Sequence, residues 1–189
     1  FNSAQIGRLN PNAGSQAAIE SSVTLFSTGV AANSGPLEII SASDGNLWYT
    51  LRRTSTNFGD NGYVGKMNVS GTVLASYNLG DITQPYGIVE GPDGNIWVTE
   101  SYTNDLVRLI LGTGAITRFD LNTFTSNAGG LTVGADNKIY FVDLSPFTYG
   151  VYTVDPFAGN TAAIQASIVL VTNSTGGVFN ETNLSSMVK

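Results

Sequence analysis

The feature that most constrains the fold is an internal repeat. Three segments of the chain align with one another: 34–51, 84–100 and 127–143. Each holds a short apolar run, a tight turn, and a run of aromatic and β-branched residues, with turn acids at Asp44, Asp93 and Asp136. These acids are 49 and then 43 residues apart. Two β-prone runs joined by an Asp-Gly or similar turn predict a β-hairpin, so the same hairpin is expected three times.

A second hairpin follows each of the first ones. Its pattern is an apolar strand, a turn with a glycine, and another strand, found at 63–79, 105–121, 149–164 and, near the N-terminus, 4–20. The turn glycines are Gly71, Gly114, Gly159 and Gly14. Four short antiparallel strands in about 45 residues are typical of a β-propeller blade. The alternative fold, a β-sandwich, would not repeat a two-hairpin unit in register.

We therefore predict an all-β fold, a β-propeller of four-stranded antiparallel blades with about four blade equivalents, in a single domain over residues 1–189. No segment shows a persuasive 3.6-residue apolar period, so helix is expected to be nearly absent. The predicted parts are a half blade at 4–20, blades at about 34–79, 84–121 and 127–164, and a tail at 165–189. Residues 21–33 and 52–62 are expected to be loops.

The path of the tail decides between two forms of this propeller. The tail contains one clear strand, residues 168–172. If that strand pairs with the N-terminal hairpin, it closes a four-bladed ring. If it does not, the chain is an arc of a larger propeller, truncated or completed by another chain. Open blade edges invite association, so an oligomer is expected in that case.

The predicted strands are apolar on both faces, as in a sheet that lies between two others. The aromatic residues Trp48, Trp97 and Tyr140 are therefore expected to pack between blades rather than to bind a cofactor. The turn acids are expected to be structural, because Asp and Asn form turns with their own backbone.

The composition excludes several classes of chemistry. The 189 residues contain no cysteine and no histidine, which rules out disulfides, thiolate metal sites and a Ser-His-Asp triad. The net charge is −6 and no basic stripe exists, so nucleic-acid binding is not expected. No apolar run approaches a membrane span. Only 12% of the residues are charged, and Ser, Thr and Asn fill the polar positions, which favours a secreted protein.

Four Asn-x-Ser/Thr motifs make glycosylation possible in a secreted chain. Their asparagines are Asn68, Asn173, Asn180 and Asn183.

The repeat also resembles a known family. The segments "GPLEIISASDGNLWYT" and "QPYGIVEGPDGNIWVTE", followed by "GKMNVSGTVLASYNL" and "VRLILGTGAITRFDL", are similar to blades of the virginiamycin B lyase (streptogramin lyase) family. The resemblance covers roughly residues 4–164. It implies a seven-bladed lyase that opens an ester of streptogramin antibiotics by elimination, with a magnesium ion, histidines and a glutamate in the central mouth. Glu100 matches the glutamate of a Trp-x-Thr-Glu strand, and Tyr86 stands where such a blade can carry a histidine.

Hairpin geometry places candidate site residues together. Positions equidistant from the turn lie opposite each other, so Tyr86 is expected beside Glu100, Leu37 beside Leu51, and Gly129 beside Asp143. These strand ends are expected to gather at one mouth of the propeller, the usual binding site of such a fold. The predicted mouth residues are Tyr86, Glu100, Tyr102, Asp143, Arg52 and Arg53.

Glu100 and Asp143 allow three roles. They are suitable ligands for Ca²⁺ or Mg²⁺, they can act as a general acid/base pair if their pKa values are raised, or they are strand-end acids bonded to backbone and arginine. Because the chain lacks histidine and is short for seven blades, we expect a secreted, non-catalytic binding or structural module for a small molecule or carbohydrate. The alternatives are a metal-assisted lyase or hydrolase of a lactone or ester, with Glu100 as the weak catalytic candidate, and a self-assembling subunit.

Overall fold

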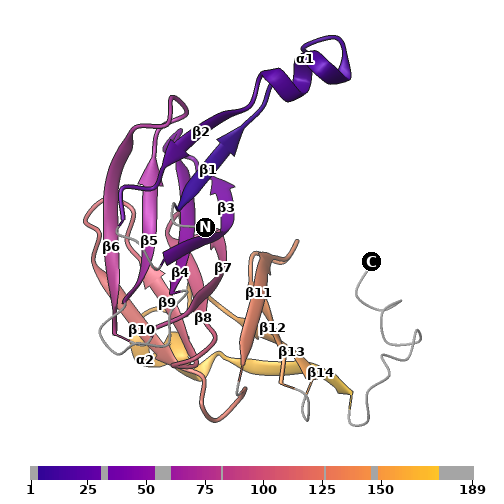
Figure 1. Cartoon of the computed structure of the whole chain (residues 1–189). Helices are drawn as coiled ribbons and strands as arrows, with labels where there is room; N and C mark the ends of the chain where they lie inside the picture. The colour runs from indigo at the N-terminus through magenta and orange to yellow at the C-terminus, as the bar shows by residue number, and fades with distance from the viewer. Residues whose placement is uncertain are drawn as a thin grey trace. The chain divides into compact units, whose positions relative to one another are not determined.

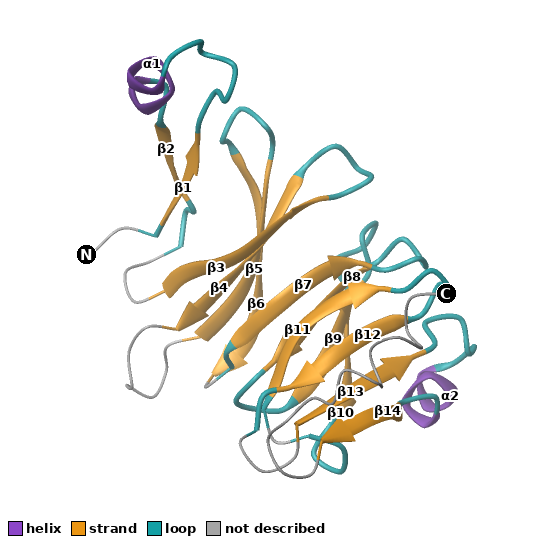
Figure 2. Ribbon diagram, turned by 90° about the vertical axis from the view of Figure 1, so that its right-hand side faces the viewer, coloured by secondary structure: helices purple, strands orange, loops and turns teal. Residues whose placement is uncertain are grey.

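The computed structural model describes residues 4–30, 34–53, 61–81, 83–125, 127–145 and 149–174. The chain divides into two compact units, Phe1–Ile82 and Thr83–Lys189, each of which is considered by itself. The prediction of a single domain stays a prediction. Strands predominate in both units (Figures 1 and 2), and no helix within the described ranges is long and apolar enough to cross a membrane.

The first unit contains a two-stranded sheet and a four-stranded sheet. The two-stranded sheet pairs β1 (Gln5–Arg8) with β2 (Thr24–Ser27), and the helix α1 (Gln16–Ser21) lies between them in the sequence. The four-stranded sheet is antiparallel and follows the chain order β3 (Ser34–Ser41), β4 (Leu47–Arg53), β5 (Asn61–Met67) and β6 (Val73–Asp81). This unit therefore consists of half a blade and one full blade.

The second unit contains two full blades. The first is built from β7 (Pro85–Glu90), β8 (Ile96–Glu100), β9 (Asp105–Leu109) and β10 (Ile116–Asp120). The second is built from β11 (Ala128–Val133), β12 (Ile139–Asp143), β13 (Tyr149–Val154) and β14 (Val169–Ser174), with α2 (Thr161–Ala166) before its last strand. The prediction of four-stranded antiparallel blades is confirmed.

The first turn of every blade is closed by its predicted acid. The residue after the acid has a positive φ, which suits the glycines Gly45 (77°) and Gly94 (71°), and which Asn137 (59°) tolerates. The Asp93 carboxylate accepts hydrogen bonds from the backbone N–H of Asn95 (3.3 Å) and from Nε1 of Trp97 (2.9 Å). Asp44 and Asp136 accept from Trp48 Nε1 (3.2 Å) and from the hydroxyl of Tyr140 (3.0 Å). The aromatic residue is thus tied to the turn in all three blades.

Two segments predicted as strands are helices. Residues 16–21 and 161–166 form α1 and α2, because Ser15 and Asn160 cap the first turn by accepting from the N–H of Ala18 and Ala163. Alanine is the strongest helix former, and both segments contain an Ala-Ala pair. In each case the last strand of the hairpin begins after the helix, as β2 and β14. The expected loop 21–33 therefore contains β2. The expected loop 52–62 is also shorter, since β4 continues to Arg53 and β5 begins at Asn61.

Of the two paths left open for the tail strand, pairing with the N-terminal hairpin is not the one observed. β14 pairs with β13, from Tyr149↔Ser174 to Thr153↔Val169, and is the fourth strand of its own blade. The third blade therefore ends near residue 174 and not at 164, because α2 displaces its last strand. This pairing gives no support to closure of a four-bladed ring by the tail strand, and the arc of a larger propeller stays the expectation.

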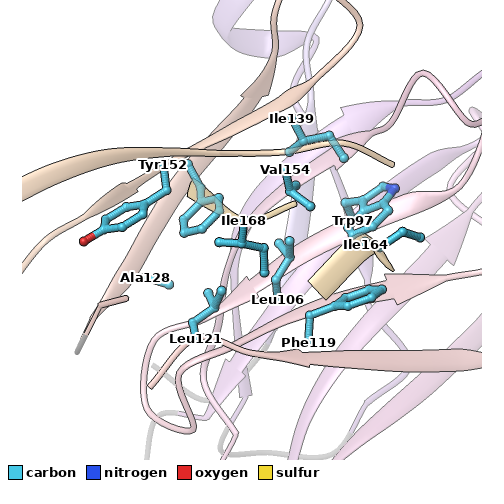
Figure 3. Close-up of a cluster of buried hydrophobic side chains, with 11 residues drawn as sticks. Trp97, Leu106, Phe119, Leu121, Ala128, Ile139, Tyr152, Val154, Ile164 and Ile168 are labelled. Carbon is cyan, nitrogen blue, oxygen red and sulfur yellow. The ribbon is translucent and has the colours of Figure 1, made fainter. Parts of the chain in front are cut away.

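The core of the second unit joins its two blades. Trp97 stacks on Phe119 (5.4 Å between ring centroids), and both belong to a buried cluster with Ile139, Val154 and Ile164 from the following blade. Figure 3 shows Ile164 beside these two rings. The predicted packing of Trp97 between blades is thus observed. Tyr140 differs, because it is only half-buried.

The turn acids accept hydrogen bonds from aromatic residues that differ in burial, so their removal should destabilise the fold to different extents. Asp93→Ala should lower the free energy of unfolding by about 1–3 kcal/mol, because it leaves Nε1 of the buried Trp97 without its acceptor. Asp136→Ala is the matched control and should cost less, because the Tyr140 hydroxyl at an exposed turn gains water instead. Urea unfolding of both variants measures the difference. Equal losses would contradict a role for the buried indole.

Candidate functional site

A β-bulge at the end of each inner hairpin shifts the predicted pairs by one residue. Glu100 lies opposite Pro85 and not Tyr86, and the next pair along is Ile88↔Val98. The other blades show the same shift, with the pairs Pro36↔Leu51 and Ala128↔Asp143. The extra residue in the first strand leaves a backbone N–H without a partner in the strand ladder. This is the N–H of Gly87, which donates a hydrogen bond to Thr99 Oγ1 (3.0 Å). The predicted pairings were wrong because sequence symmetry about a turn does not show a bulge.

Glu100 is the buried acid at the end of β8. Its side chain is completely inaccessible to solvent. Its Oε2 accepts a hydrogen bond from Thr103 Oγ1 (2.7 Å) and forms an ion pair with Nη1 of Arg118 on β10. Its Oε1 is buried and has no hydrogen-bond partner. Asp105, which lies opposite Glu100 across the next hairpin, shares the same guanidinium at 3.3 Å.

Burial dominates the electrostatics of this cluster. It raises the pKa of Glu100 above the ordinary value, although the hydrogen bonds and positive charge of Arg118 and the hydroxyl of Thr103 act in the opposite direction. Burial likewise raises the pKa of Asp105, against the effect of Arg118. Arg118 therefore forms ion pairs with two carboxyl groups, and burial raises the pKa of both.

Asp143 is the corresponding acid at the end of β12, and it is satisfied by its own chain. Its Oδ1 accepts from the backbone N–H of Ser145 (3.0 Å) and its Oδ2 accepts from the Ser145 hydroxyl (2.8 Å). The residue is almost completely buried. Its charge adds to burial in raising the pKa of Tyr152. Asp143 thus stabilises the turn that follows β12.

Three of the other predicted mouth residues, Tyr86, Tyr102 and Arg52, are more exposed than Glu100 and Asp143. Tyr86 is half-buried on β7, and Tyr102 is largely exposed in the turn after Glu100. Arg52 is exposed on β4, and Arg53 is the last residue of that strand. Both arginines belong to the first compact unit, so their placement beside Glu100 stays a prediction.

Sequence reasoning missed Arg118, Thr103 and Asp105. The sequence did contain a signal for this cluster. Glu100 is the last residue of one strand, Asp105 is the first residue of the next, and a four-residue turn joins the two strands. Like charges directly opposite each other in a hairpin are unfavourable and require a cation nearby. Arg118 lies on the next strand along and supplies that cation.

The donor atoms at these strand ends do not fit a divalent cation. A hard cation needs several free oxygen ligands, but Glu100 is neutralised by a guanidinium and both oxygens of Asp143 accept from Ser145. No group of three or more acidic residues suited to a metal ion occurs in the part of the chain that the structure describes. The prediction of Ca²⁺ or Mg²⁺ at Glu100 and Asp143 thus lacks support from the geometry.

The glycosylation candidates are distributed over both units. Asn68 is half-buried in the β5–β6 turn, where its carboxamide oxygen accepts from the N–H of Ser70 (3.0 Å) and Thr72 (2.9 Å). Asn173 lies on β14. Asn180 and Asn183 lie outside the described residues. All four sites stay predictions.

The raised pKa of Glu100 predicts a pH dependence of stability. The folded chain holds this proton more tightly than the unfolded chain, so Glu100 stabilises the fold at low pH. That contribution is lost as the pH rises from the ordinary value of 4.5 through the raised pKa. Glu100→Gln cannot titrate, so its free energy of unfolding should fall less over this interval. Urea unfolding at a series of pH values tests this, with the exposed Glu20→Gln as control; parallel curves for wild type and Glu100→Gln would refute it.

Removing the guanidinium of Arg118 should lower the free energy of unfolding more at neutral pH than at acidic pH. Arg118→Met keeps the aliphatic packing but leaves the buried carboxylate of Glu100 unpaired, at a cost of about 2 kcal/mol near neutral pH. This is below the usual range for a buried pair because the Arg118 side chain is 34% exposed. The loss should shrink on acidification, when Glu100 is protonated. Arg52→Met is the control, and a loss that is independent of pH would exclude the ion pair as its cause.

Comparisons with known proteins agree with this architecture. A streptogramin B lyase structure superposes with a TM-score of 0.69 at 22% identity, covering 92% of this chain and 49% of that chain. A catalytically inactive virginiamycin B lyase from Staphylococcus aureus with quinupristin gives 0.64 at 22% identity, with coverages of 89% and 48%. A gluconolactonase from Xanthomonas campestris gives 0.59 at 16% identity, with coverages of 93% and 57%. The chain spans about half the length of the lyase structures. No curated protein sequence matches it.

The model of one protein family also matches the sequence directly. The match extends over residues 2–155, which is most of the chain and includes the half blade, both full blades that follow, and most of the last one. The repeat, the four-stranded blades and this match lead to the same conclusion: the chain belongs to the virginiamycin B lyase family.

Proposed function

We propose that this chain is a non-catalytic binding or structural module built from lyase-type blades. The observation that carries the proposal is the ion pair of Glu100 with Arg118. Glu100 is the residue that matches the glutamate of the family's Trp-x-Thr-Glu strand, and here a guanidinium from β10 neutralises it. The chain also contains no histidine to act as general acid or base beside it.

A small molecule or carbohydrate is the ligand class that these strand ends suit best. Tyr102 follows Glu100 by two residues and exposes most of its ring, and Tyr86 is accessible in part. Aromatic faces with neighbouring hydroxyl and carboxyl groups are common in sites for such ligands. We also propose an extracellular location, because the chain is rich in Ser, Thr and Asn and carries four glycosylation motifs.

A second candidate function is a lyase or hydrolase that acts on a lactone or ester. It is favoured by Oε1 of Glu100, a buried acceptor without a hydrogen-bond partner on a carboxyl group whose pKa is raised by burial. Such a group is suited to general acid/base work. The matched structures include a streptogramin B lyase and a gluconolactonase. This candidate requires Arg118 to release Glu100 when a substrate binds.

One assay separates the two candidates. The chain is incubated with quinupristin, the molecule present in the structure of the inactive staphylococcal lyase, and ring opening is followed by mass spectrometry with and without Mg²⁺. A non-catalytic module should give no more product than Glu100→Gln. Turnover that Glu100→Gln abolishes and Glu20→Gln leaves unchanged would overturn the proposal and favour the second candidate. The same comparison with a gluconolactone tests the hydrolase form.

A further inference from the structure

Three acids form a row across the strand ends of the β7–β10 blade. Glu100 lies directly opposite Asp105, and Asp105 lies directly opposite Asp120. Residues opposite each other in an antiparallel pair point to the same face of the sheet, so the three carboxyl groups share one face. Arg118 lies two residues before Asp120 on β10 and points to this face as well.

The row carries more negative charge than its arginine offsets. Arg118 forms ion pairs with Glu100 and with Asp105 (3.3 Å), and among the described residues it is the one cation that pairs with these acids. The acids also act on one another. Burial, and then the charge of Asp120, raise the pKa of Asp105, and the charge of Asp105 adds to burial in raising the pKa of Glu100. One positive charge is therefore balanced against three acids.

Two buried oxygen atoms in this region have no hydrogen-bond donor among the described residues. Glu100 is completely inaccessible to solvent, and its Oε1 has no partner, although its Oε2 binds Thr103 and Arg118. Asn104 precedes Asp105, is 3% exposed, and has the same deficit at its Oδ1. A buried acceptor without a donor is costly. Both atoms therefore indicate an occupant that brings N–H or O–H groups.

The outer members of the row are accessible to a ligand. The side chain of Arg118 is 34% exposed, and Asp120 is exposed. Tyr102, two residues after Glu100, is 62% exposed. The face of an aromatic ring attracts a cation, and an exposed ring close to carboxylates suits an organic cation in particular. Movement of the Arg118 side chain is sufficient to open a path to the buried carboxyl group.

We propose that this row of acids binds a small molecule that carries a protonated primary amine. The ammonium group donates to Oε1 of Glu100 and to the carboxylate of Asp105, and its charge offsets that of Asp120. A hydroxyl group next to the amine, as in an amino sugar, supplies a donor for Oδ1 of Asn104. The inference rests on the proposed function as a binding module and names the chemistry of its ligand.

An ammonium group suits these atoms better than a metal ion or a neutral ligand. Ca²⁺ takes about six to eight oxygen ligands, whereas each N–H of an ammonium group needs a single acceptor. A neutral hydroxyl group would satisfy Oε1 of Glu100 but would leave the excess negative charge of the row unchanged. The row should therefore distinguish ligands by their positive charge.

A matched set of three sugars tests this distinction. Glucosamine, glucose and N-acetylglucosamine differ at one carbon atom, which carries an ammonium, a hydroxyl or an acetamido group. Each is titrated into the isotope-labelled full chain just below neutral pH, where the amine is protonated, and backbone amide shifts are followed by NMR.

Glucosamine should shift the amides of residues 100–105 and 118–120 saturably. The other two sugars should need at least about tenfold higher concentrations, because they lack the charged hydrogen bonds. Equal binding of the three sugars would overturn the proposal, and so would the absence of shifts at these residues.

Two variants and a control locate the site. Asp120→Asn removes an exposed charge of the row and should weaken glucosamine binding about threefold. Arg118→Met removes the competing cation and should strengthen it. Glu20→Gln removes one exposed charge from α1 and should leave it unchanged. Equal weakening by Asp120→Asn and Glu20→Gln would assign the preference to the net charge of the chain and refute the site.

Failure of this inference can be distinguished from failure of the proposed function. Turnover of quinupristin that Glu100→Gln abolishes would refute the non-catalytic module, whichever sugar binds. No preference for glucosamine, in a chain that also shows no turnover, would refute the amine ligand and leave the module in place.

Discussion

The hydrogen bond from an aromatic side chain to the turn acid four residues earlier is the constraint on which each blade depends. It fixes the turn and the rotamer of Trp48, Trp97 or Tyr140 at once, because one carboxylate accepts from both the backbone and the ring. With the turn fixed, the register of the two inner strands is fixed as well. That register, with its bulge, decides which side chain ends each second strand.

The turn, the register and the bulge together determine the position of Glu100. The bulge sets it opposite Pro85, and the short turn after β8 sets it opposite Asp105. Two acids at adjacent strand ends repel each other unless a cation lies between them. Arg118 on the outer strand β10 forms an ion pair with both. The same strand end in the next blade carries Asp143, which bonds instead to Ser145. Equivalent acids therefore differ in chemistry because their neighbours differ, and a repeat of architecture does not imply a repeat of function.

The sequence predicted the parts of the fold that repeat and missed the parts that do not. Turn acids, turn glycines and the four-strand unit recur, so alignment of the chain with itself was sufficient to find them. The helices α1 and α2 were missed because each is a single short segment whose caps, Ser15 and Asn160, sit where a hairpin turn was expected. The bulges were missed since a hairpin read by symmetry has no extra residue. Arg118 was missed because its contact with Glu100 skips a strand, and single-strand patterns carry no information about such pairs.

The two helices also affect the order in which the chain folds. They lie in connections of 15 residues between β1 and β2 and of 14 between β13 and β14, whereas β9 and β10 are joined by six. Each doubling of a flexible connection adds about 0.6 kcal/mol to the entropic cost of closing it, and local contacts form faster than distant ones. The strands after the helices, β2 and β14, are therefore expected to join their sheets late. The blade of β7–β10, with short connections throughout, is where ordering of the chain is expected to begin.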